Sequence, residues 1–298
     1  MRHVRFERVG LLMSERLKIF LLLLPALLVL GGLFGGGLLV AVLRSINYLP
    51  AFGLTQPTLS AYISLLSDGD FYRSLLLSFH IAFTSTLISA VLAVAAALLL
   101  RRQVFGRALA NFLFQLNLTV PHLVGAIGIL YLFSQSGSFA RLAAAGGMIE
   151  RPADFPAMVF DPYAIGIILQ YVWKEVPFIG VIVLASLQAL GNDYEAAARS
   201  LGASRWQTFR HVLLPMLLPS LSGASAIVFA FTFGAFEIPA LLGANYPAAL
   251  PVLAYRNFTN VDLAARLEAM AMSVVIALLG GIMIALYLRF SQRRARQH

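Results

Sequence analysis

Three ionisable side chains interrupt apolar stretches of this sequence, and what they can do depends on what faces them. Lys174 and Glu175 fall within one apolar run, and Glu237 falls within another. A charge at the centre of a bilayer costs roughly 2.5–3.5 kcal/mol on the insertion scale, so such groups usually face a partner or a watery cavity. The spacing permits a Lys174–Glu237 or Lys174–Glu175 ion pair that fixes helix packing. Alternatively, Glu237 borders a solute path with Tyr171 and Trp173, and its charge selects a cation.

A polar segment, residues 195–215, separates two apolar runs and begins with helix signals. Asn192 has the side chain of a helix N-cap, and Glu195 follows it at the spacing of a capping box. Gly202 suits the residue that ends a helix, because glycine enters the left-handed conformation without steric cost. We therefore predict a short helix that stops at a glycine elbow.

A second short helix is predicted to follow the elbow. Ser204 and Gln207 repeat the capping-box spacing. Pro215 and Pro219 are expected to interrupt this helix, because proline lacks an amide hydrogen and clashes with the preceding turn. The two short helices and the elbow between them are expected to form a compact docking surface for a partner outside the bilayer.

Polar residues also gather in another apolar run, which holds Asn117, Thr119, Pro121 and His122. Proline in a membrane helix frees a backbone carbonyl and permits a bend. These residues are interpreted as interhelical hydrogen-bonding groups, with a hinge or a path-lining role as the alternative.

Signals for catalysis are absent from the sequence. There is no phosphate-binding loop of the Gly-x-x-x-x-Gly-Lys-Ser/Thr type, no Ser-His-Asp arrangement and no His-Glu-x-x-His. The chain has no cysteine, and its five histidines are scattered. We therefore expect no catalytic residue, no metal site and no cofactor, and any ATP hydrolysis must come from another chain.

Composition and hydropathy place most of the chain in a membrane. Hydrophobic residues make up 60% and charged residues 12%, whereas about a quarter of residues are charged in soluble domains. A span needs about 20 apolar residues. Six stretches qualify, at residues 19–43, 75–100, 109–134, 163–188, 215–242 and 269–289. We predict an all-α polytopic membrane protein with six transmembrane helices, the first of them retained rather than cleaved as a signal peptide.

Arginine and lysine are distributed unevenly between alternate loops. Segments 1–18, 101–107, 191–211 and 289–298 carry fifteen of them, whereas loops 44–73, 135–162 and 243–268 carry six. Because basic residues accumulate on the cytoplasmic side, both termini and the polar segment are expected in the cytoplasm. The net charge of +9 then indicates membrane anchoring rather than binding to nucleic acid.

The polar segment resembles the EAA loop found in permease subunits of binding-protein-dependent ABC importers of type I. That family's pattern is Glu-Ala-Ala, three residues, a glycine, nine residues, an aliphatic residue, any residue and Leu-Pro. Here Glu195-Ala196-Ala197 precedes Gly202, and after nine residues come Val212 and then Leu214-Pro215. Valine stands where isoleucine is usual. The likeness extends from about residue 75 to the end of the chain.

The resemblance implies a permease with several partners in a bacterial or archaeal inner membrane. In this family a second permease subunit, either a different chain or a copy, pairs with the first. Two ATPase subunits bind on the cytoplasmic side, and an extracytoplasmic binding protein delivers the substrate. The loop fits a cleft of the ATPase and passes its closure to the membrane helices.

The resemblance also assigns residues and boundaries. The expected domain runs over 19–289, with a core at about 75–289 and a coupling loop at 193–214, between a cytoplasmic segment, 1–18, and a basic tail, 290–298. The residues expected to couple to the ATPase are Glu195, Ala196, Ala197, Arg199, Gly202, Arg205, Trp206 and Pro215. Those expected to border the translocation path are Tyr171, Trp173, Lys174 and Glu237.

Substrate is the least determined feature of this interpretation. Three stretches, 171–178, 233–239 and 250–256, look most similar to permeases for polyamines such as spermidine or putrescine. Sugar, sulfate and ferric ion are the alternatives within the family. A secondary transporter driven by an ion gradient is an alternative from another class, and it predicts inverted repeats and midplane carboxylates; we find no clear repeat. A membrane scaffold without transport activity is a third alternative.

Overall fold

The structure of this chain is a computed structural model that describes all residues except 1–14, 49, 51–52, 54, 103–105 and 296–298. The described part consists of helices, turns and loops, without a strand. Most of the predicted segment 1–18 and the end of the predicted basic tail lie outside the described residues.

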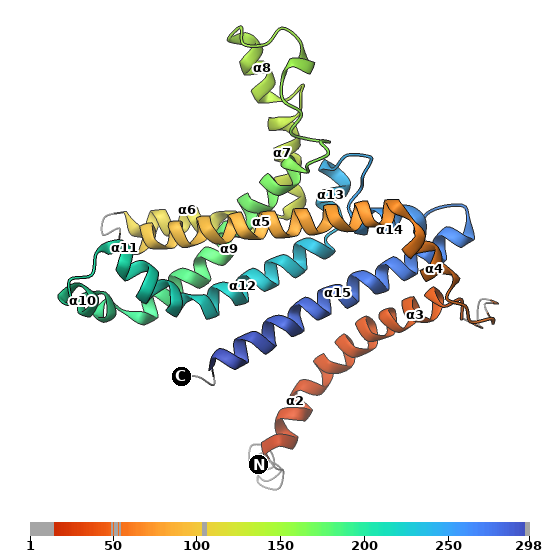
Figure 1. Cartoon of the computed structure of the whole chain (residues 1–298), viewed down its shortest axis with the longest axis horizontal. Helices are drawn as coiled ribbons and strands as arrows, with labels where there is room; N and C mark the ends of the chain where they lie inside the picture. Colours follow the sequence, from red (N-terminus) through yellow and green to blue (C-terminus); the bar gives the residue numbers. More distant parts are fainter. Residues whose placement is uncertain (1–14, 49, 51–52, 54, 103–105, 296–298) are drawn as a thin grey trace, which may run out of the picture.

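Long helices dominate the fold (Figure 1). The elements are α2 (Glu15–Leu30), η1 (Gly31–Gly35), α3 (Gly36–Ser45), α4 (Ser60–Ser67), α5 (Gly69–Arg102), α6 (Arg107–Thr119), α7 (His122–Phe133), α8 (Ser138–Ala145), η3 (Pro152–Asp154), α9 (Ile165–Leu190), α10 (Asp193–Ser200), α11 (Arg205–Thr208), η4 (Phe209–Leu213), α12 (Leu214–Gly234), α13 (Glu237–Leu242), α14 (Leu250–Phe258) and α15 (Leu263–Ala295).

Six segments of the described chain are long and apolar enough to cross a membrane, as the sequence predicted. They are Leu17–Ser45, Gly69–Arg101, His122–Ala145, Ile165–Leu190, Arg205–Gly234 and Leu263–Tyr287. Two predicted spans differ in detail. The stretch 109–134 is split between α6 and α7, and the stretch 215–242 ends as a continuous helix at the carboxyl end of α12.

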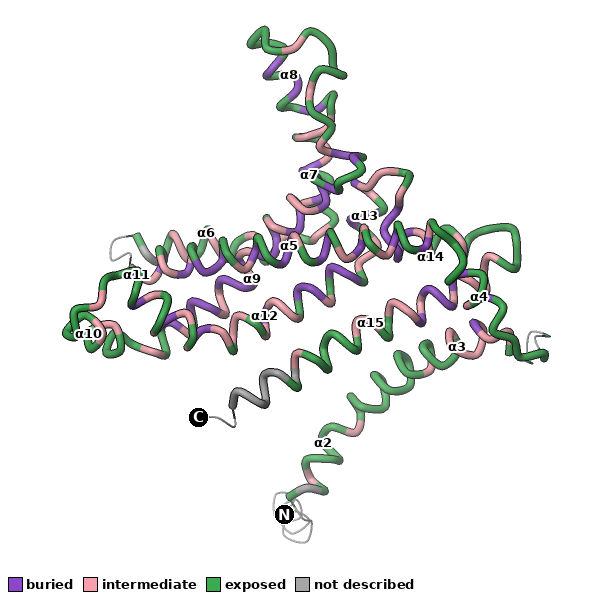
Figure 2. The backbone as a smooth tube through the Cα atoms, in the orientation of Figure 1, coloured by how far each residue is buried: buried purple, intermediate pink, exposed green. Residues whose placement is uncertain are grey.

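Helices α5, α9 and α12 form the centre of the bundle, with α15 alongside α12 (Figure 1). Apolar side chains join α5, α9 and α12 near one end, where Ala97, Val183 and Leu217 are buried. Figure 2 shows the most continuous burial along α9. This central position explains why the polar groups of α9 must find partners inside the protein.

The first span stands apart from the bundle. Figure 2 shows α2 exposed along its length, and only α3 lies against α15. The glycines at 31, 32, 35, 36 and 37 have no neighbouring atom within 4 Å of the position of an added Cβ. Among the described residues no other helix packs closely against these glycines, which lie in and beside the π-helical turn η1.

Helices α7 and α8 project away from the bundle (Figure 1). After α8, residues 146–164 form an irregular segment that contains only the short helix η3. One end of the bundle carries α10, α11 and the end of α5, and the other end carries α4 and the connection from α14 to α15.

Candidate functional site

The coupling loop, residues 193–214, begins with the predicted short helix and glycine elbow. Gly202 has a φ of +83°, a conformation that favours glycine. Its amide donates to the carbonyl of Arg199 at 3.0 Å. The next amide, of Ala203, donates to the carbonyl of Ala198 at 3.0 Å. These bonds satisfy carbonyls that the end of α10 leaves unpaired, so the prediction is confirmed.

The second helix of the loop also begins as predicted. The Gln207 amide donates to Ser204 Oγ at 3.3 Å, and the Ser204 amide donates to Gln207 Oε1 at 2.8 Å. The predicted interruption at Pro215 and Pro219 is wrong, because α11, η4 and α12 follow one another without a break. The π-helical turn η4 directly precedes Pro215, and its wider pairing gives the proline ring room without ending the helix.

The capping box predicted for Asn192 and Glu195 is not formed. Arg101 Nη2 donates to Asn192 Oδ1 at 2.9 Å, and Arg101 Nη1 donates to the Glu195 carboxylate. Arg101 also donates to the carbonyl of Gly191. Because both partners of the Arg101–Glu195 bond are charged, this bond is stronger than one from a neutral backbone amide. The two expected capping groups therefore bind the end of α5 instead.

Sequence reasoning missed Arg101, which it counted only as a basic residue of an inner loop. Its side chain is only 12% exposed and that of Glu195 only 18% exposed, so their ion pair is largely shielded from solvent. The two residues lie 94 positions apart, and no spacing rule connects them. One signal could have indicated this pair. Arg101 ends a predicted span on the side of the membrane where the polar segment with Glu195 is also expected.

The spacing between the alanines and the glycine of the loop departs from the family's pattern. Four residues, 198–201, separate Ala197 from Gly202, one more than in the pattern of the family that the segment resembles. One residue corresponds to a rotation of about 100° around a helix. Relative to Gly202, Glu195 is thus displaced by one position, and its carboxylate points to Arg101.

The other predicted coupling residues lie on the outward surface of the loop. All are exposed: Ala196, Ala197, Arg199, Gly202, Arg205, Trp206 and Pro215. The Trp206 ring is 5.5 Å from that of Phe209 and is 64% exposed. A groove of about 400 Å³ lies beside it, lined by Leu98, Asn192, Glu195, Arg199, Arg205, Thr208, Phe209 and Leu213. Exposed tryptophan and arginine are the side chains most enriched at binding hot spots.

A second polar cluster lies inside the bundle, where Pro121 separates α6 from α7. Because proline has no amide hydrogen, the carbonyl of Asn117 loses the bond from residue 121 that an α-helix would supply, and it accepts from the Val120 amide at 3.1 Å. Lys174 Nζ, from α9, donates to the carbonyls of Asn117 at 2.5 Å, of Leu118 at 3.3 Å and of Val120. An ammonium group has three donors, and the carboxyl end of a helix favours a cation. The broken end of α6 therefore takes up the whole bonding capacity of Lys174.

A side chain of α6 also donates to a backbone carbonyl of α9. Pro177 interrupts the bonding of α9 and frees the carbonyl of Trp173, as Pro121 frees that of Asn117. Asn117 Nδ2 donates to the Trp173 carbonyl. Each helix thus supplies the donor that the proline of the other helix removes, and the predicted interhelical role of Asn117 is confirmed.

Neither expected ion pair of Lys174 is formed. Lys174 donates to backbone carbonyls, whereas the Glu175 carboxylate lies 3.3 Å from His122 Nε2. Glu237 is exposed and begins α13, after a non-helical step at residues 235–236. The carbonyls freed at the break in α6 compete successfully for the ammonium, because they are fixed beside it.

The remaining predicted path residues differ in exposure. Tyr171 has no exposed surface, its ring lies 6.5 Å from that of Phe231, and its hydroxyl has no hydrogen-bond partner in the described part of the chain. Trp173 is 43% exposed. Trp173 and Glu237 therefore reach the surface of the single chain, whereas Tyr171 and Lys174 are enclosed.

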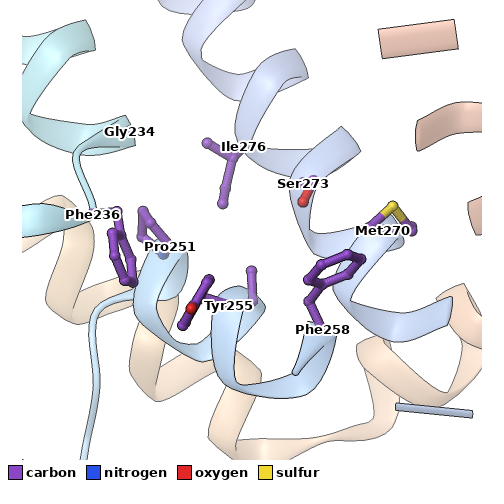
Figure 3. A pocket seen from close by; sticks show the side chains of 9 residues that line it. Gly234, Phe236, Pro251, Tyr255, Phe258, Met270, Ser273 and Ile276 are labelled. Carbon is purple, nitrogen blue, oxygen red and sulfur yellow. The ribbon is translucent and has the colours of Figure 1, made fainter. Parts of the chain in front are cut away.

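A second hollow, of about 400 Å³, lies between the end of α12 and the pair α14 and α15 (Figure 3). Its lining is mainly aromatic and apolar: Gly234, Phe236, Pro251, Ala254, Tyr255, Phe258, Met270, Ser273 and Ile276. Over the described residues, no group of three or more histidine, aspartate or glutamate side chains is placed to hold a metal ion.

Fold and sites together define a polytopic helical membrane protein with a structured polar loop at one end of its bundle. Residues 85–297 match the family described as the binding-protein-dependent transport system inner membrane component. The match covers more than half of the chain, and the chain belongs to this family.

The sequence identity to individual relatives is below 30% for the two described here. The chain is 28% identical to the sulfate transport system permease protein CysT of Escherichia coli (strain K12) over 193 residues, 64% of this chain and 66% of that protein. It is 27% identical over 227 residues to the thiamine transport system permease protein ThiP of the same organism, 75% of this chain and 41% of that protein. The matches thus span about two thirds or less of the length of these relatives.

A solved structure shows the same fold. One chain of a bacterial ABC transporter involved in the import of the acidic polysaccharide alginate superposes with a TM-score of 0.76, at 18% sequence identity. The superposition covers 96% of this chain and 99% of that chain. The described helices therefore have the same fold as that chain.

Proposed function

We propose that this chain is the transmembrane permease subunit of an ATP-driven ABC importer. Its spans form part of the translocation path, and its coupling loop docks a separate ATPase. The observation that carries the proposal is the coupling loop. It combines a rigid, capped backbone with an exposed Trp206, a polar groove and a buried anchor to α5.

The proposed assembly contains several other chains. A second permease subunit, either a different chain or a copy, completes the path, two ATPase subunits dock on the coupling loops, and an extracytoplasmic binding protein delivers the substrate. Family membership and the fold shared with an alginate importer support this composition. The permease has no catalytic role in this scheme; it lies in the inner membrane among lipids.

Substitution of the glycine elbow tests the docking function. We expect Gly202→Asp to abolish co-purification of the ATPase subunit from native membranes, because aspartate at a φ of +83° is strained by roughly 1–2 kcal/mol and adds a charge to the docking surface. Gly147→Asp is the matched control. Gly147 also has a positive φ of +69° and open space around it, but it follows α8 and is not part of the coupling loop. An undiminished yield of ATPase with Gly202→Asp contradicts the proposal, as does full transport by this chain without ATP.

For the substrate we propose a cation, with a polyamine such as spermidine or putrescine as the specific case. The support is electrostatic. Glu237 is exposed. The Glu175 carboxylate contacts His122, and the Lys174 ammonium is bound to backbone carbonyls. The fixed charge available to a path along these helices is therefore negative. The relatives named above carry sulfate and thiamine transport in their names, so the family itself does not select among substrates.

Neutralisation of Glu237 tests the substrate. In the reconstituted importer we expect Glu237→Gln to lower spermidine uptake about tenfold, which corresponds to about 1.4 kcal/mol and the loss of one ammonium–carboxylate contact. Glu150→Gln, in the irregular segment after α8, removes an exposed carboxylate elsewhere and serves as the control. Unchanged substrate preference with Glu237→Gln at normal membrane abundance excludes the role of Glu237 in selection.

A further inference from the structure

The last turn of α5 is bonded to the start of the coupling loop through one side chain. Arg101 donates to the Glu195 carboxylate, to the Gly191 carbonyl and, at 2.9 Å, to Asn192 Oδ1. Nη1 binds the Glu195 carboxylate and Nη2 binds the other two acceptors, so the bonds use both terminal nitrogens of the planar guanidinium group, which has five donors in a fixed geometry. Because the side chains of Arg101 and Glu195 are only 12% and 18% exposed, solvent competes little for the bond between them, whereas the acceptors on Gly191 and Asn192 lie at the surface.

This contact changes how the coupling loop is attached to the bundle. The chain itself connects the loop only to α9 and α12. Arg101 adds a third attachment, to a helix that is far from the loop in sequence. A force applied to the loop therefore reaches α5 directly and not only through the packing of α9 and α12.

The opposite end of α5 holds the connection between α13 and α14. Tyr246, in that connection, donates to Asp70 Oδ1 at 2.6 Å and accepts from Arg73, which also pairs with Asp70 at 3.1 Å. Deeper in the bundle, Ser78 Oγ accepts from the amide of Leu250, the first residue of α14, at 2.7 Å. The outer connection is thus fixed to α5 by one exposed and one buried set of contacts.

Between these two ends α5 is one continuous helix of 34 residues, about 50 Å long at 1.5 Å per residue. Helices α9 and α12 are continuous, but each contains an internal proline, Pro177 and Pro219, which breaks one backbone hydrogen bond of the helix. The sequence of α5 contains no proline. A helix without such a break bends less than one with it. Among the central helices, α5 is the one built to move as a rigid rod.

We propose that Arg101 is a positioning residue that makes α5 move with the coupling loop, so that closure of the ATPase is transmitted along α5 to the connection between α13 and α14. The proposal rests on the proposed function as an importer. It assigns Glu195 to the joint inside this chain, whereas the exposed residues of the loop contact the ATPase.

The test separates coupling from assembly. In the complete importer, reconstituted in liposomes with its ATPase and binding protein, we expect Arg101→Ala to retain the ATPase and to hydrolyse ATP, while substrate transported per ATP falls at least tenfold. Arg101→Lys keeps the charge but offers one nitrogen for three acceptors, so an intermediate ratio is expected. Arg266→Ala, which removes an arginine bonded to the carbonyl of Asn260, is the control and leaves the ratio unchanged.

A distance measurement reports the joint directly. The chain has no cysteine, so Leu99→Cys on α5 and Leu201→Cys on the loop, both exposed, can carry the only two spin labels. We expect a narrow distance distribution with Arg101 present and a distribution at least twice as broad in Arg101→Ala. An equally narrow distribution in Arg101→Ala overturns the proposal.

Two further results decide the remaining cases. If Arg101→Ala does not reach the membrane, Asn192→Ala removes one acceptor of Arg101, and we expect about threefold less transport per ATP; an unchanged ratio overturns the proposal. If the unsubstituted importer neither binds an ATPase nor transports with ATP, the proposed function fails. If the unsubstituted importer transports and Arg101→Ala has the same ratio, the proposed function stands and only the role of Arg101 fails.

Discussion

At the scale of single residues, the described structure shows how a membrane protein satisfies backbone groups that proline leaves unpaired. Lys174 and Asn117 each donate to a carbonyl freed by a proline on the facing helix. A charged side chain inside a span usually indicates function. Here the ammonium stabilises a break between two helices, and the position of that break determines where α7 leaves the bundle.

Removal of the Lys174 ammonium should destabilise the protein. Lys174→Met keeps most of the side-chain volume but removes the ammonium that binds three carbonyls at the end of α6. Of these carbonyls, that of Asn117 keeps a bond from the Val120 amide at 3.1 Å. We expect a loss of about 2 kcal/mol, the usual range for unpaired buried groups. Thermal unfolding in detergent, followed by tryptophan fluorescence, measures it.

The matched control for this substitution is the other lysine of the chain. Lys18→Met removes an ammonium whose partner is Glu15, an exposed side chain at the start of α2, and such surface pairs contribute little. We expect its unfolding temperature to stay near that of the unsubstituted protein. Equal unfolding temperatures for the two variants contradict the stabilising role of Lys174.

At the scale of elements, apolar run length predicts where helices are but not how they connect. The runs at 75–100 and 269–289 fall within α5 and α15, and the run at 163–188 lies within α9 except for its first two residues, because about 20 apolar residues have few other stable states in a bilayer. Pro121 marks the position of the break in the third run. The carbonyls exposed at this break are bound by Lys174, which lies 53 positions later in the chain. No local rule contains such a contact.

The coupling loop shows the same limit at shorter range. Ser204, Gln207 and Gly202 were predicted with their roles because caps and left-handed glycines are determined by neighbouring residues. The capping box at Asn192 and Glu195 was wrong, since Arg101 from α5 supplies a stronger donor. The outward set of loop residues follows from the sequence, whereas the inward joint requires the fold.

At the scale of the whole molecule, the chain presents large apolar surfaces that its own residues do not cover. The window of highest hydropathy in the first span has no buried residue, and Figure 2 shows exposure along α2. In water such a surface is unfavourable, whereas hydrocarbon or a second permease subunit covers it at no such cost. The exposed first span therefore fits a subunit that is surrounded by lipid and assembled with partners.

Orientation in the membrane follows from the distribution of basic residues and has a direct test. Fifteen arginines and lysines in one set of segments against six in the other predict that the coupling loop faces the cytoplasm and that the connection from α14 to α15 faces outward. Leu201 and Val261 are 89% and 92% exposed at these two places.

We expect a membrane-impermeant maleimide to label Val261→Cys but not Leu201→Cys in intact spheroplasts, and the reverse in inside-out vesicles. The unsubstituted chain is the control, since it has no cysteine. Labelling of Leu201→Cys from outside places the loop beyond the reach of a cytoplasmic ATPase, and the importer mechanism then fails together with the orientation.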